Sequence, residues 1–397
     1  MKEKIQFDTI CAKEVPDPRT TAPHILPIYA TSAFAFDSID QGIDIFTGKE
    51  KGHVYSRYGN PTIEAVAEKI GRLEAFGLDV DPGAILFSSG MSAISTLIMG
   101  LLKSGDTILS QGNLYGGTTE LLTKIFQPLG IQTTMLDLRN LEAVEQQLKT
   151  DPSIRMLLFE TPANPTLACV DMEALCGLAK KYGVYTFVDN TFSTPYLQQP
   201  FKYGVDFIVH STTKFLNGHG NSIAGALVGR DKELMRTKIW TAMKLAGTNS
   251  SPWEAWLVHN GMKTLALRMD RHSENALGLA RFLEAHNKVD RVNYPGLESH
   301  PDYVLGQKQM RASGGMLSFE LAGGLEAGKN LMRKLKYCSL APSLGEVDTL
   351  ILHPASMSHL NIPKEIRLKN GITDGLIRVS VGLENITDII GDIEQAM

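Results

Sequence analysis

The sequence has few cysteines and no apolar segment long enough to span a membrane. Its four cysteines are Cys11, Cys169, Cys176 and Cys338, and they form no C-x-x-C pair. Their spacing matches neither a disulfide framework nor a zinc site. The first residues carry charge and no apolar stretch follows them, which argues against a signal peptide. We therefore expect a cytoplasmic protein that does not enter a membrane.

The sequence also lacks an excess of positive charge. The formal net charge is -4, and lysines and arginines are scattered among acidic residues. This pattern gives no electrostatic reason to expect nucleic acid or an anionic membrane as a partner. The 397 residues are 43% hydrophobic, which is sufficient for one large domain and one smaller domain.

The chain divides into three regions. Residues 1–61 contain many prolines, among them Pro16 and Pro18, and predict an N-terminal arm that contacts a neighbouring subunit. Residues 62–255 alternate short apolar segments with helical periodicity, which predicts an α/β domain with a mostly parallel sheet. Residues 256–397 contain two strand-like segments between helices and predict a smaller C-terminal α+β domain.

Four expected strands end in polar or turn residues. They cover 84–87, 156–159, 184–188 and 207–209, and a fifth strand is expected at 107–109. Helices are expected at about 92–102, 118–126, 172–181 and, with breaks, 252–285. Because ligands bind at the carboxyl ends of parallel strands, the residues after the four strands are candidate site residues. These segments begin at Ser88, Glu160, Asp189 and His210.

Each candidate alone has an ordinary structural explanation. Ser89 or Ser92 can cap a helix, Asp189 can form a salt bridge, and a lysine such as Lys214 is most often a surface residue. Together they match what pyridoxal phosphate (PLP) requires from a protein: a lysine for its aldehyde, an acid for its pyridine nitrogen, a cradle for its phosphate and a ring against its face. The residues that meet these needs are Lys214 for the aldehyde, Asp189 for the nitrogen, Gly90, Met91, Ser211 and Thr213 for the phosphate, and Tyr115 for the ring.

Seven segments in order along the chain carry a resemblance to a known family. They are YSRYGNP from Tyr55, SSGM from Ser88, LYGGT from Leu114, ETPANP from Glu160, VDNTF from Val188, HSTTK from His210 and IRVSVGLE from Ile377. The sequence resembles the Cys/Met-metabolism PLP-dependent enzymes of trans-sulfuration. The resemblance implies the aspartate-aminotransferase-like fold (fold type I) and a homotetramer built from two dimers that share active sites.

The resemblance also implies roles for individual residues. Lys214 would bond the cofactor aldehyde and move protons, Asp189 would pair with the pyridine nitrogen, and Tyr115 would stack on the ring and act as a proton donor. Tyr55 and Arg57 would reach the phosphate of the neighbouring subunit. The substrate would be oriented by Asn164, Ser343 and Arg378, the last through a bidentate contact with its carboxylate.

Within the family, the segment from His353 to His359 most resembles that of the methionine gamma-lyases. These enzymes eliminate a thiol from L-methionine or homocysteine and release 2-oxobutyrate and ammonia. The chain departs from them at Gly117, where they typically carry cysteine, and at Leu245, where they carry aspartate. The alternatives are γ-replacement on an O-acetyl- or O-succinylhomoserine (a sulfhydrylase or cystathionine gamma-synthase) and cystathionine cleavage. Pro342 in place of a frequent glutamate counts against cystathionine.

Other functional classes fit less well. Ser211 to Lys214 matches the S-x-x-K motif of serine β-lactamases, but S-D-N and K-T-G are absent. The Gly218-His219-Gly220 segment lacks the third glycine of a dinucleotide fingerprint. The spacing of the histidines fits no metal site, so no metal is expected. A PLP-fold protein without activity is disfavoured by the presence of both Lys214 and Asp189.

Overall fold

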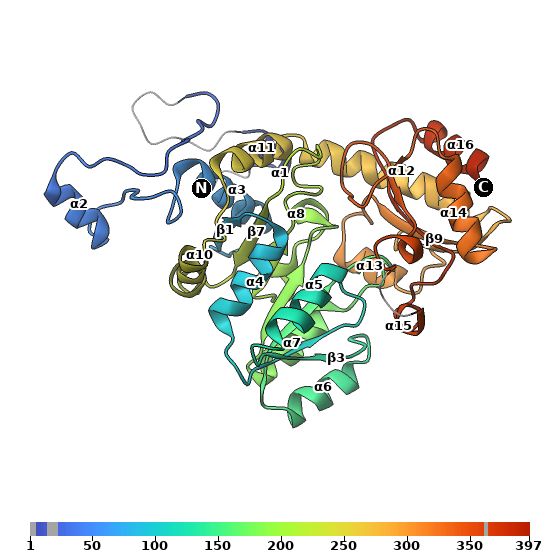
Figure 1. Ribbon diagram of the computed structural model, residues 1–397, viewed down its shortest axis with the longest axis horizontal. Helices are drawn as coiled ribbons and strands as arrows, with labels where there is room; N and C mark the ends of the chain where they lie inside the picture. The colour runs from blue at the N-terminus through green and yellow to red at the C-terminus, as the bar shows by residue number, and fades with distance from the viewer. Residues whose placement is uncertain (1–4, 14–22, 361–363) are drawn as a thin grey trace.

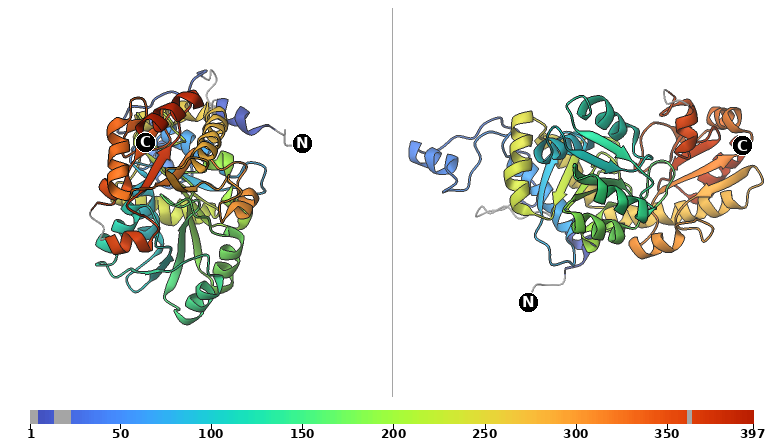
Figure 2. Two further views of the ribbon diagram at one scale, coloured as in Figure 1. Left: turned by 90° about the vertical axis from the view of Figure 1, so that its right-hand side faces the viewer. Right: turned by 90° about the horizontal axis from the view of Figure 1, so that it is seen from below.

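The chain folds around two β-sheets, each covered by helices (Figure 1). The computed structural model describes residues 5–13, 23–360 and 364–397, so Pro16 and Pro18 lie outside the described residues. The larger sheet lies in the middle of an elongated molecule, the smaller sheet lies toward the C-terminus, and an N-terminal segment with α2 extends at the opposite end (Figures 1 and 2).

The larger sheet has seven strands in the order β1-β7-β6-β5-β4-β2-β3. Strand β7 pairs antiparallel with β1 and with β6, whereas the other neighbouring pairs are parallel. Every strand except β7 therefore runs in one direction, which confirms the predicted mostly parallel sheet. The strands are β1 (Gly83–Phe87), β2 (Thr107–Ser110), β3 (Gln132–Met135), β4 (Ile154–Glu160), β5 (Tyr185–Asp189), β6 (Phe207–His210) and β7 (Gly225–Gly229).

Helices cover both faces of this sheet because apolar side chains alternate between the faces of each strand. On β5, Val188 belongs to a core that includes Val66 of α3, whereas Phe187 belongs to a second core that includes Leu97 of α4. The helices up to α11 are α1 (Phe7–Ala12), α2 (Ile39–Phe46), α3 (Pro61–Glu74), α4 (Gly90–Leu101), α5 (Gly116–Glu120), η1 (Leu121–Phe126), α6 (Leu141–Thr150), α7 (Met172–Tyr182), α8 (Thr194–Leu197), η2 (Pro200–Tyr203), α9 (Lys232–Leu234), η3 (Met235–Ile239), α10 (Trp240–Ala246) and α11 (Pro252–Met262).

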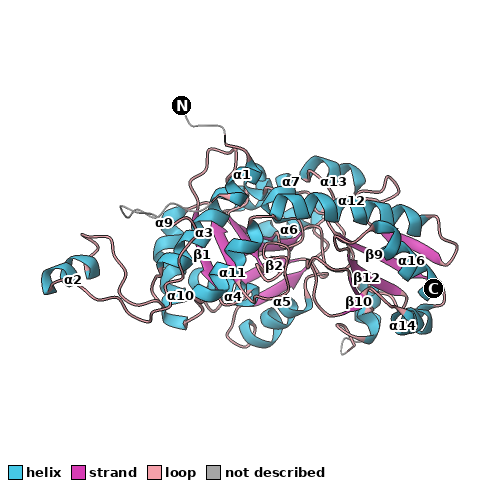
Figure 3. Cartoon of the chain, turned by 90° about the horizontal axis from the view of Figure 1, so that it is seen from above, coloured by secondary structure: helices cyan, strands magenta, loops and turns pink. Residues whose placement is uncertain are grey.

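The smaller sheet has five strands in the order β10-β11-β12-β9-β8. Helix α12 packs against α1 and α8 beside the larger sheet and against β8 and β9 in the smaller one, so it connects the two (Figure 3). The elements of this region are α12 (Leu265–Glu284), β8 (Val289–Asn293), α13 (Tyr303–Gln309), β9 (Met316–Leu321), α14 (Gly324–Lys334), β10 (Ser339–Leu340), β11 (Leu350–Leu352), η4 (Pro354–Ser356), α15 (Lys364–Lys369), β12 (Leu376–Ser380) and α16 (Ile386–Ala396).

The five strands predicted for the larger sheet and the two predicted near the C-terminus are all present, with ends shifted by one or two residues. Strands β3 and β7 of the larger sheet and β8, β10 and β11 of the smaller sheet were not predicted. The sequence of β3 is polar, and β7 has glycine at both ends, so neither has an apolar strand pattern. The expected long helix is two helices, α11 and α12, which are separated at Lys263 and Thr264. Among the described residues, no helix is long and apolar enough to cross a bilayer.

Candidate active site

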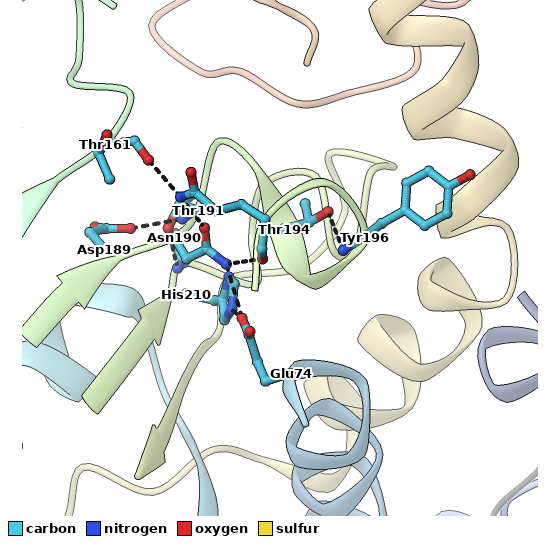
Figure 4. A network of polar contacts seen from close by, with 10 residues as sticks. Glu74, Thr161, Asp189, Asn190, Thr191, Thr194, Tyr196 and His210 are labelled. Atoms are coloured by element: carbon cyan, nitrogen blue, oxygen red, sulfur yellow. Dashed lines mark hydrogen bonds and ion pairs between the residues drawn. The ribbon is translucent and has the colours of Figure 1, made fainter. Parts of the chain in front are cut away.

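Two acidic side chains lie at the carboxyl ends of adjacent parallel strands. Glu160 ends β4, Asp189 ends β5, and the two residues are paired in register, so their side chains project from the same face of the sheet. The backbone N–H of Thr191 donates to Asp189 Oδ1 at 2.9 Å (Figure 4). Burial raises the pKa of Asp189, and the hydrogen bonds from Thr191 and the charge of His210 lower it. Burial and the nearby Asp189 raise the pKa of Glu160 to about 8.

Lys214 lies in the turn that follows β6. Its backbone N–H donates to the carbonyl of Ser211 at 3.1 Å, and its Nζ donates to Ser343 Oγ at 3.1 Å. Burial and the nearby guanidinium of Arg378 lower the pKa of Lys214, whereas Glu346 raises it. A lysine with a lowered pKa has a larger fraction of neutral amine, which is the form that attacks an aldehyde.

The predicted phosphate cradle is a close contact between two turns. Gly90 begins α4, and a Cβ atom on it would lie 2.9 Å from Ser211 Cβ. On the other side, a Cβ on Gly225 would lie 2.1 Å from the carbonyl oxygen of Ser89. Both positions therefore require glycine. The turn leaves the first N–H groups of α4, including that of Met91, at a helix N-terminus where an anion is favoured.

The second turn of the cradle is held by the strands below it. Ser211 N–H donates to Thr191 Oγ1 at 2.8 Å, and Thr213 Oγ1 lies 3.1 Å from the carbonyl of Ala224. Thr191 therefore links Asp189 to the Ser211 turn, so the predicted pyridine site and the predicted phosphate site belong to one hydrogen-bonded unit.

Glu160 positions two further predicted residues. Tyr115 N–H donates to Glu160 Oε1 at 2.7 Å, and Asn164 N–H donates to Glu160 Oε2 at 3.4 Å. Glu160 is 5% exposed, whereas Tyr115 is 48% exposed. The acid thus fixes the backbone of the Tyr115 loop from below and leaves the ring open to the site.

Arg378 comes from the smaller sheet. It lies in the middle of β12, and its Nη2 donates to the carbonyl of Ser343 at 2.8 Å. Burial lowers the pKa of Arg378 to about 10. Because Ser343 also accepts the Lys214 amine, it joins the arginine of one sheet to the lysine of the other.

The residues fit PLP and an amino-acid substrate. Among the described residues, the buried atoms without a hydrogen-bond partner include Arg378 Nε and Asn164 Oδ1. Buried donors and acceptors of this kind are costly unless a ligand satisfies them. A carboxylate would satisfy the free guanidinium edge, and the helix N-terminus at the glycine-dependent turn favours a phosphate.

Tyr55 and Arg57 lie apart from this group. Arg57 Nη1 donates to the carbonyl of Lys244 at 2.5 Å, and its guanidinium stacks on the rings of Tyr55 and Tyr58. Arg57 therefore contacts α10 of its own chain, and Tyr55 contacts Arg57.

The histidines considered for metal binding contact other groups. His210 contacts Glu74, His219 contacts the carbonyl of Asn217, His353 contacts Ser356 and the carbonyl of Asp374, and His359 contacts Ser358. In the part of the chain that the structure describes, no three His, Cys, Asp or Glu side chains are arranged to hold a metal ion. All four cysteines are buried and unbridged.

Sequence reasoning assigned no role to Glu160 or Thr191. Glu160 was noted only as part of a motif, yet its position at the end of a buried strand in register with Asp189 is a usable signal. The contacts of Thr191 with Asp189 and Ser211 depend on the relative position of two loops and leave no pattern in the sequence.

Comparisons with known proteins show which proteins this chain resembles. L-methionine gamma-lyase of Fusobacterium nucleatum is 47% identical over 373 residues, 94% of this chain and 93% of that protein. The crystal structure of cystathionine gamma-lyase from Lactobacillus plantarum, complexed with L-serine, has a TM-score of 0.90 at 37% identity and covers 99% of this chain and 98% of its own. A putative O-acetylhomoserine (thiol)-lyase from Campylobacter jejuni, solved with a pyridoxyl-lysine phosphate, has a TM-score of 0.92 at 32% identity and covers 99% of each chain.

These solved structures confirm the predicted fold type I architecture, in which a mostly parallel sheet is joined to a smaller sheet. Residues 8–397, nearly the whole chain, match the family described as Cys/Met metabolism PLP-dependent enzyme. The chain therefore belongs to the Cys/Met-metabolism PLP-dependent enzymes.

Proposed function

We propose that this enzyme is a methionine gamma-lyase, which converts L-methionine or homocysteine and water into 2-oxobutyrate, ammonia and a thiol. The observation that carries this proposal is the 47% identity to a relative of that activity over almost the whole chain. The contact that joins Lys214, Ser343 and Arg378 supports it, because an amine for proton transfer lies beside a guanidinium for the substrate carboxylate.

We assign the cofactor contacts as follows. Lys214 bonds the aldehyde of PLP, Asp189 pairs with the pyridine nitrogen and Tyr115 covers the ring. When bound, PLP supplies an electron sink for the charge that develops when a substrate carbon loses its proton. The phosphate is held by Gly90, Met91, Ser211 and Thr213.

The protein's residues orient the substrate and move protons. Arg378 binds the substrate carboxylate through its free guanidinium edge, and Asn164 and Ser343 help to fix its orientation. The Lys214 amine, freed when the substrate amine takes its place, would remove the proton from Cα and, once it has released that proton, one from Cβ; its lowered pKa suits it to act as a base. The hydroxyl of Tyr115 donates a proton to the departing sulfur. Hydrolysis of the remaining four-carbon unit gives 2-oxobutyrate and ammonia.

We further propose three regions and a homotetramer of two dimers: an arm (1–61), a large domain (62–255) and a small domain (256–397). Helix α2 extends from the body and exposes Ile39 and Phe46, as expected of a segment that packs on another subunit (Figure 2). Tyr55 and Arg57 would reach the phosphate of the neighbouring active site.

Four buried, unbridged thiols suit the reducing cytoplasm, where we expect the enzyme to work.

The second candidate is γ-replacement or cystathionine cleavage. It is favoured by Gly117, because a Cβ there would lie 2.5 Å from Tyr115 Cε1. The glycine thus lets the Tyr115 ring lie closer to the loop than the cysteine typical of methionine gamma-lyases would. A ring in that position leaves more room for a large leaving group.

Release of 2-oxobutyrate by the PLP-loaded protein tests the proposal. One sample contains L-methionine, a second L-cystathionine, and a third O-acetylhomoserine with sulfide. We expect 2-oxobutyrate and methanethiol in the first sample at the highest rate. No release from methionine, with homocysteine formed in the third sample, would contradict the proposal and favour a sulfhydrylase. The fastest release in the second sample would make the enzyme a cystathionine lyase.

A further inference from the structure

A buried acid and a buried histidine contact each other behind the proposed cofactor site. Glu74 ends α3, His210 ends β6, and both are 0% exposed. His210 Nε2 donates to Glu74 Oε1 at 2.5 Å, a short distance that is typical of a charge-assisted hydrogen bond (Figure 4). Neither residue was assigned a part in the reaction above.

This pair lies directly behind the residues of the site. Asn190 follows Asp189, and its Nδ2 donates to Glu74 Oε1 at 3.0 Å. His210 is followed by Ser211 of the phosphate turn, and it comes directly after the residue that pairs in register with Asp189. Glu74 therefore connects the ends of β5 and β6, the two strands that carry the proposed pyridine and phosphate contacts (Figure 4).

Asn190 also belongs to a wider buried network. Its Nδ2 donates to the carbonyl of Gln198 at 3.0 Å, and Gln198 Nε2 donates to the carbonyl of Thr161 at 2.8 Å (Figure 4). The network thus extends from α3 to the loop after β4. Glu74 and His210 are ionisable members of this network.

A buried pair of this kind is expensive. Removing a carboxylate and an imidazolium from water costs several kcal/mol per ion, and a well-packed apolar pair is often as stable or more stable. Here the cost is increased because Glu74 Oε2 and His210 Nδ1 have no hydrogen-bond partner in the described ranges. The pair therefore contributes little to the stability of the fold, and a role in the site would account for its presence.

The charges around Asp189 suggest that role. From β4, Glu160 faces Asp189, and burial and the Asp189 charge raise the pKa of Glu160 to about 8. From β6, a positive His210 favours the ionisation of Asp189, and that charge is among the causes that lower the pKa of Asp189. The Glu74 carboxylate lies 2.5 Å from His210 Nε2, which is close enough to pair with a positive imidazole.

We propose that Glu74 holds His210 as a cation, and that this cation keeps Asp189 ionised so that the pyridine nitrogen of bound PLP stays protonated. Both are positioning residues that act through Asp189. The inference rests on the proposed contact between Asp189 and the pyridine nitrogen.

Two NMR measurements on the PLP-loaded enzyme test the inference. In the first, wild-type protein labelled with ¹⁵N-histidine should show both ring nitrogens of His210 protonated, assigned by the loss of the signal in His210→Gln. A neutral His210 would overturn the proposal. The protonation state is read from the wild-type protein, and only the assignment uses His210→Gln, so the measurement remains decisive if Glu74→Gln is unstable.

The second measurement uses ¹⁵N-labelled PLP. In Glu74→Gln and His210→Gln the pyridine ¹⁵N signal should move toward the unprotonated value, and kcat should fall by about tenfold or more with little change in KM. Tyr294→Phe is the matched control, since it removes a buried hydrogen bond from Tyr294 to the carbonyl of Gly314 near the smaller sheet. An unmoved signal in both variants, with only the loss of thermal stability seen in the control, would overturn the inference.

Failure of the proposed function has a different signature. If PLP does not bond a lysine of the wild-type protein, its visible absorbance does not shift on mixing, and the cofactor assignment itself is wrong. If that shift occurs and the pyridine signal is the same in wild type and variants, only the role of Glu74 and His210 is wrong.

Discussion

The two sheets carry residues of the proposed site that differ in how many of their hydrogen bonds are made within the protein. At the carboxyl ends of the strands of the larger sheet, hydrogen bonds to neighbouring strands and loops hold Asp189, Ser211 and Tyr115 in place. On the smaller sheet, Arg378 has one bond to Ser343 and a free Nε. These three residues of the cofactor side thus each have a hydrogen bond within the chain, whereas Arg378 on the substrate side keeps an unsatisfied nitrogen.

This difference follows from what each side binds. A resident cofactor needs a rigid cradle, because groups that are already oriented lose little freedom on binding. A substrate that enters and leaves can contribute part of the hydrogen bonding itself, and its absence leaves buried polar atoms unpaired. Substitutions on the two sides should therefore have different effects.

The largest effect is expected for Lys214→Ala. This change removes the amine that bonds PLP and moves protons, so kcat should fall by about 10³-fold or more, in line with the loss of a general base and a covalent contact. Release of 2-oxobutyrate and the visible absorbance of lysine-bound PLP are the measurements. Lys202→Ala is the control because Lys202 is an exposed lysine of the same sheet domain. Retention of the absorbance band would show that Lys214 is misassigned.

Arg378→Lys should damage the substrate side alone. The ammonium keeps the charge but loses the planar fork, so kcat/KM should fall about 10- to 100-fold, mainly through KM, as expected for hydrogen bonds to a charged group. PLP affinity should not change. Arg291→Lys is the matched control, since Arg291 lies in the same sheet and its ion pair with Glu320 is partly exposed. A loss of PLP affinity in Arg378→Lys would contradict the separation of the two sides.

Much of the fold was predictable because it depends on local patterns. The apolar strands β4, β5 and β6 end in polar residues, and parallel strands bring such ends to one edge of a sheet. Strand β7 was missed because its glycines are required by close packing, Gly225 against the Ser89 turn and Gly229 against Met235. That constraint arises only when two distant segments meet.

The residues that carry the chemistry of the site were predictable from the sequence, whereas the hydrogen bonds that position them were less so. Lys214, Asp189 and Arg378 belong to motifs, whereas the contacts of Glu160 with Tyr115 and Asn164 cross from one loop to another. The contact between Lys214 and Ser343 spans the two sheets and follows from their relative position. Tyr55 and Arg57 illustrate the limit, since we propose that they act in a neighbouring subunit, and their contacts within one chain do not test that role.

Glu160→Gln should alter how the stability of the protein depends on pH. In PLP-free protein, burial and Asp189 raise the pKa of Glu160 from 4.5 to about 8. Between these two values the folded state holds a proton that the unfolded state has lost, so this group's contribution to stability falls as pH rises. Glutamine cannot titrate, and it can still accept the N–H of Tyr115. The wild-type melting temperature should therefore decline relative to the variant between about pH 5 and pH 8. Parallel melting curves would show that Glu160 is not the titrating group.

The smallest effect is expected for Gly117→Cys. This change tests whether the position of the Tyr115 ring controls the choice of substrate. A Cβ at this position would lie 2.5 Å from Tyr115 Cε1, so the half-exposed ring must turn toward the site. A narrower pocket should favour the methylthio group of methionine over the longer chain of cystathionine, and we expect the ratio of their kcat/KM values to rise by about tenfold. Gly116→Cys is the matched control, because a Cβ there meets no atom within 4 Å. An equal change in both variants would mean that loop stiffness, and not the position of the Tyr115 ring, controls the preference.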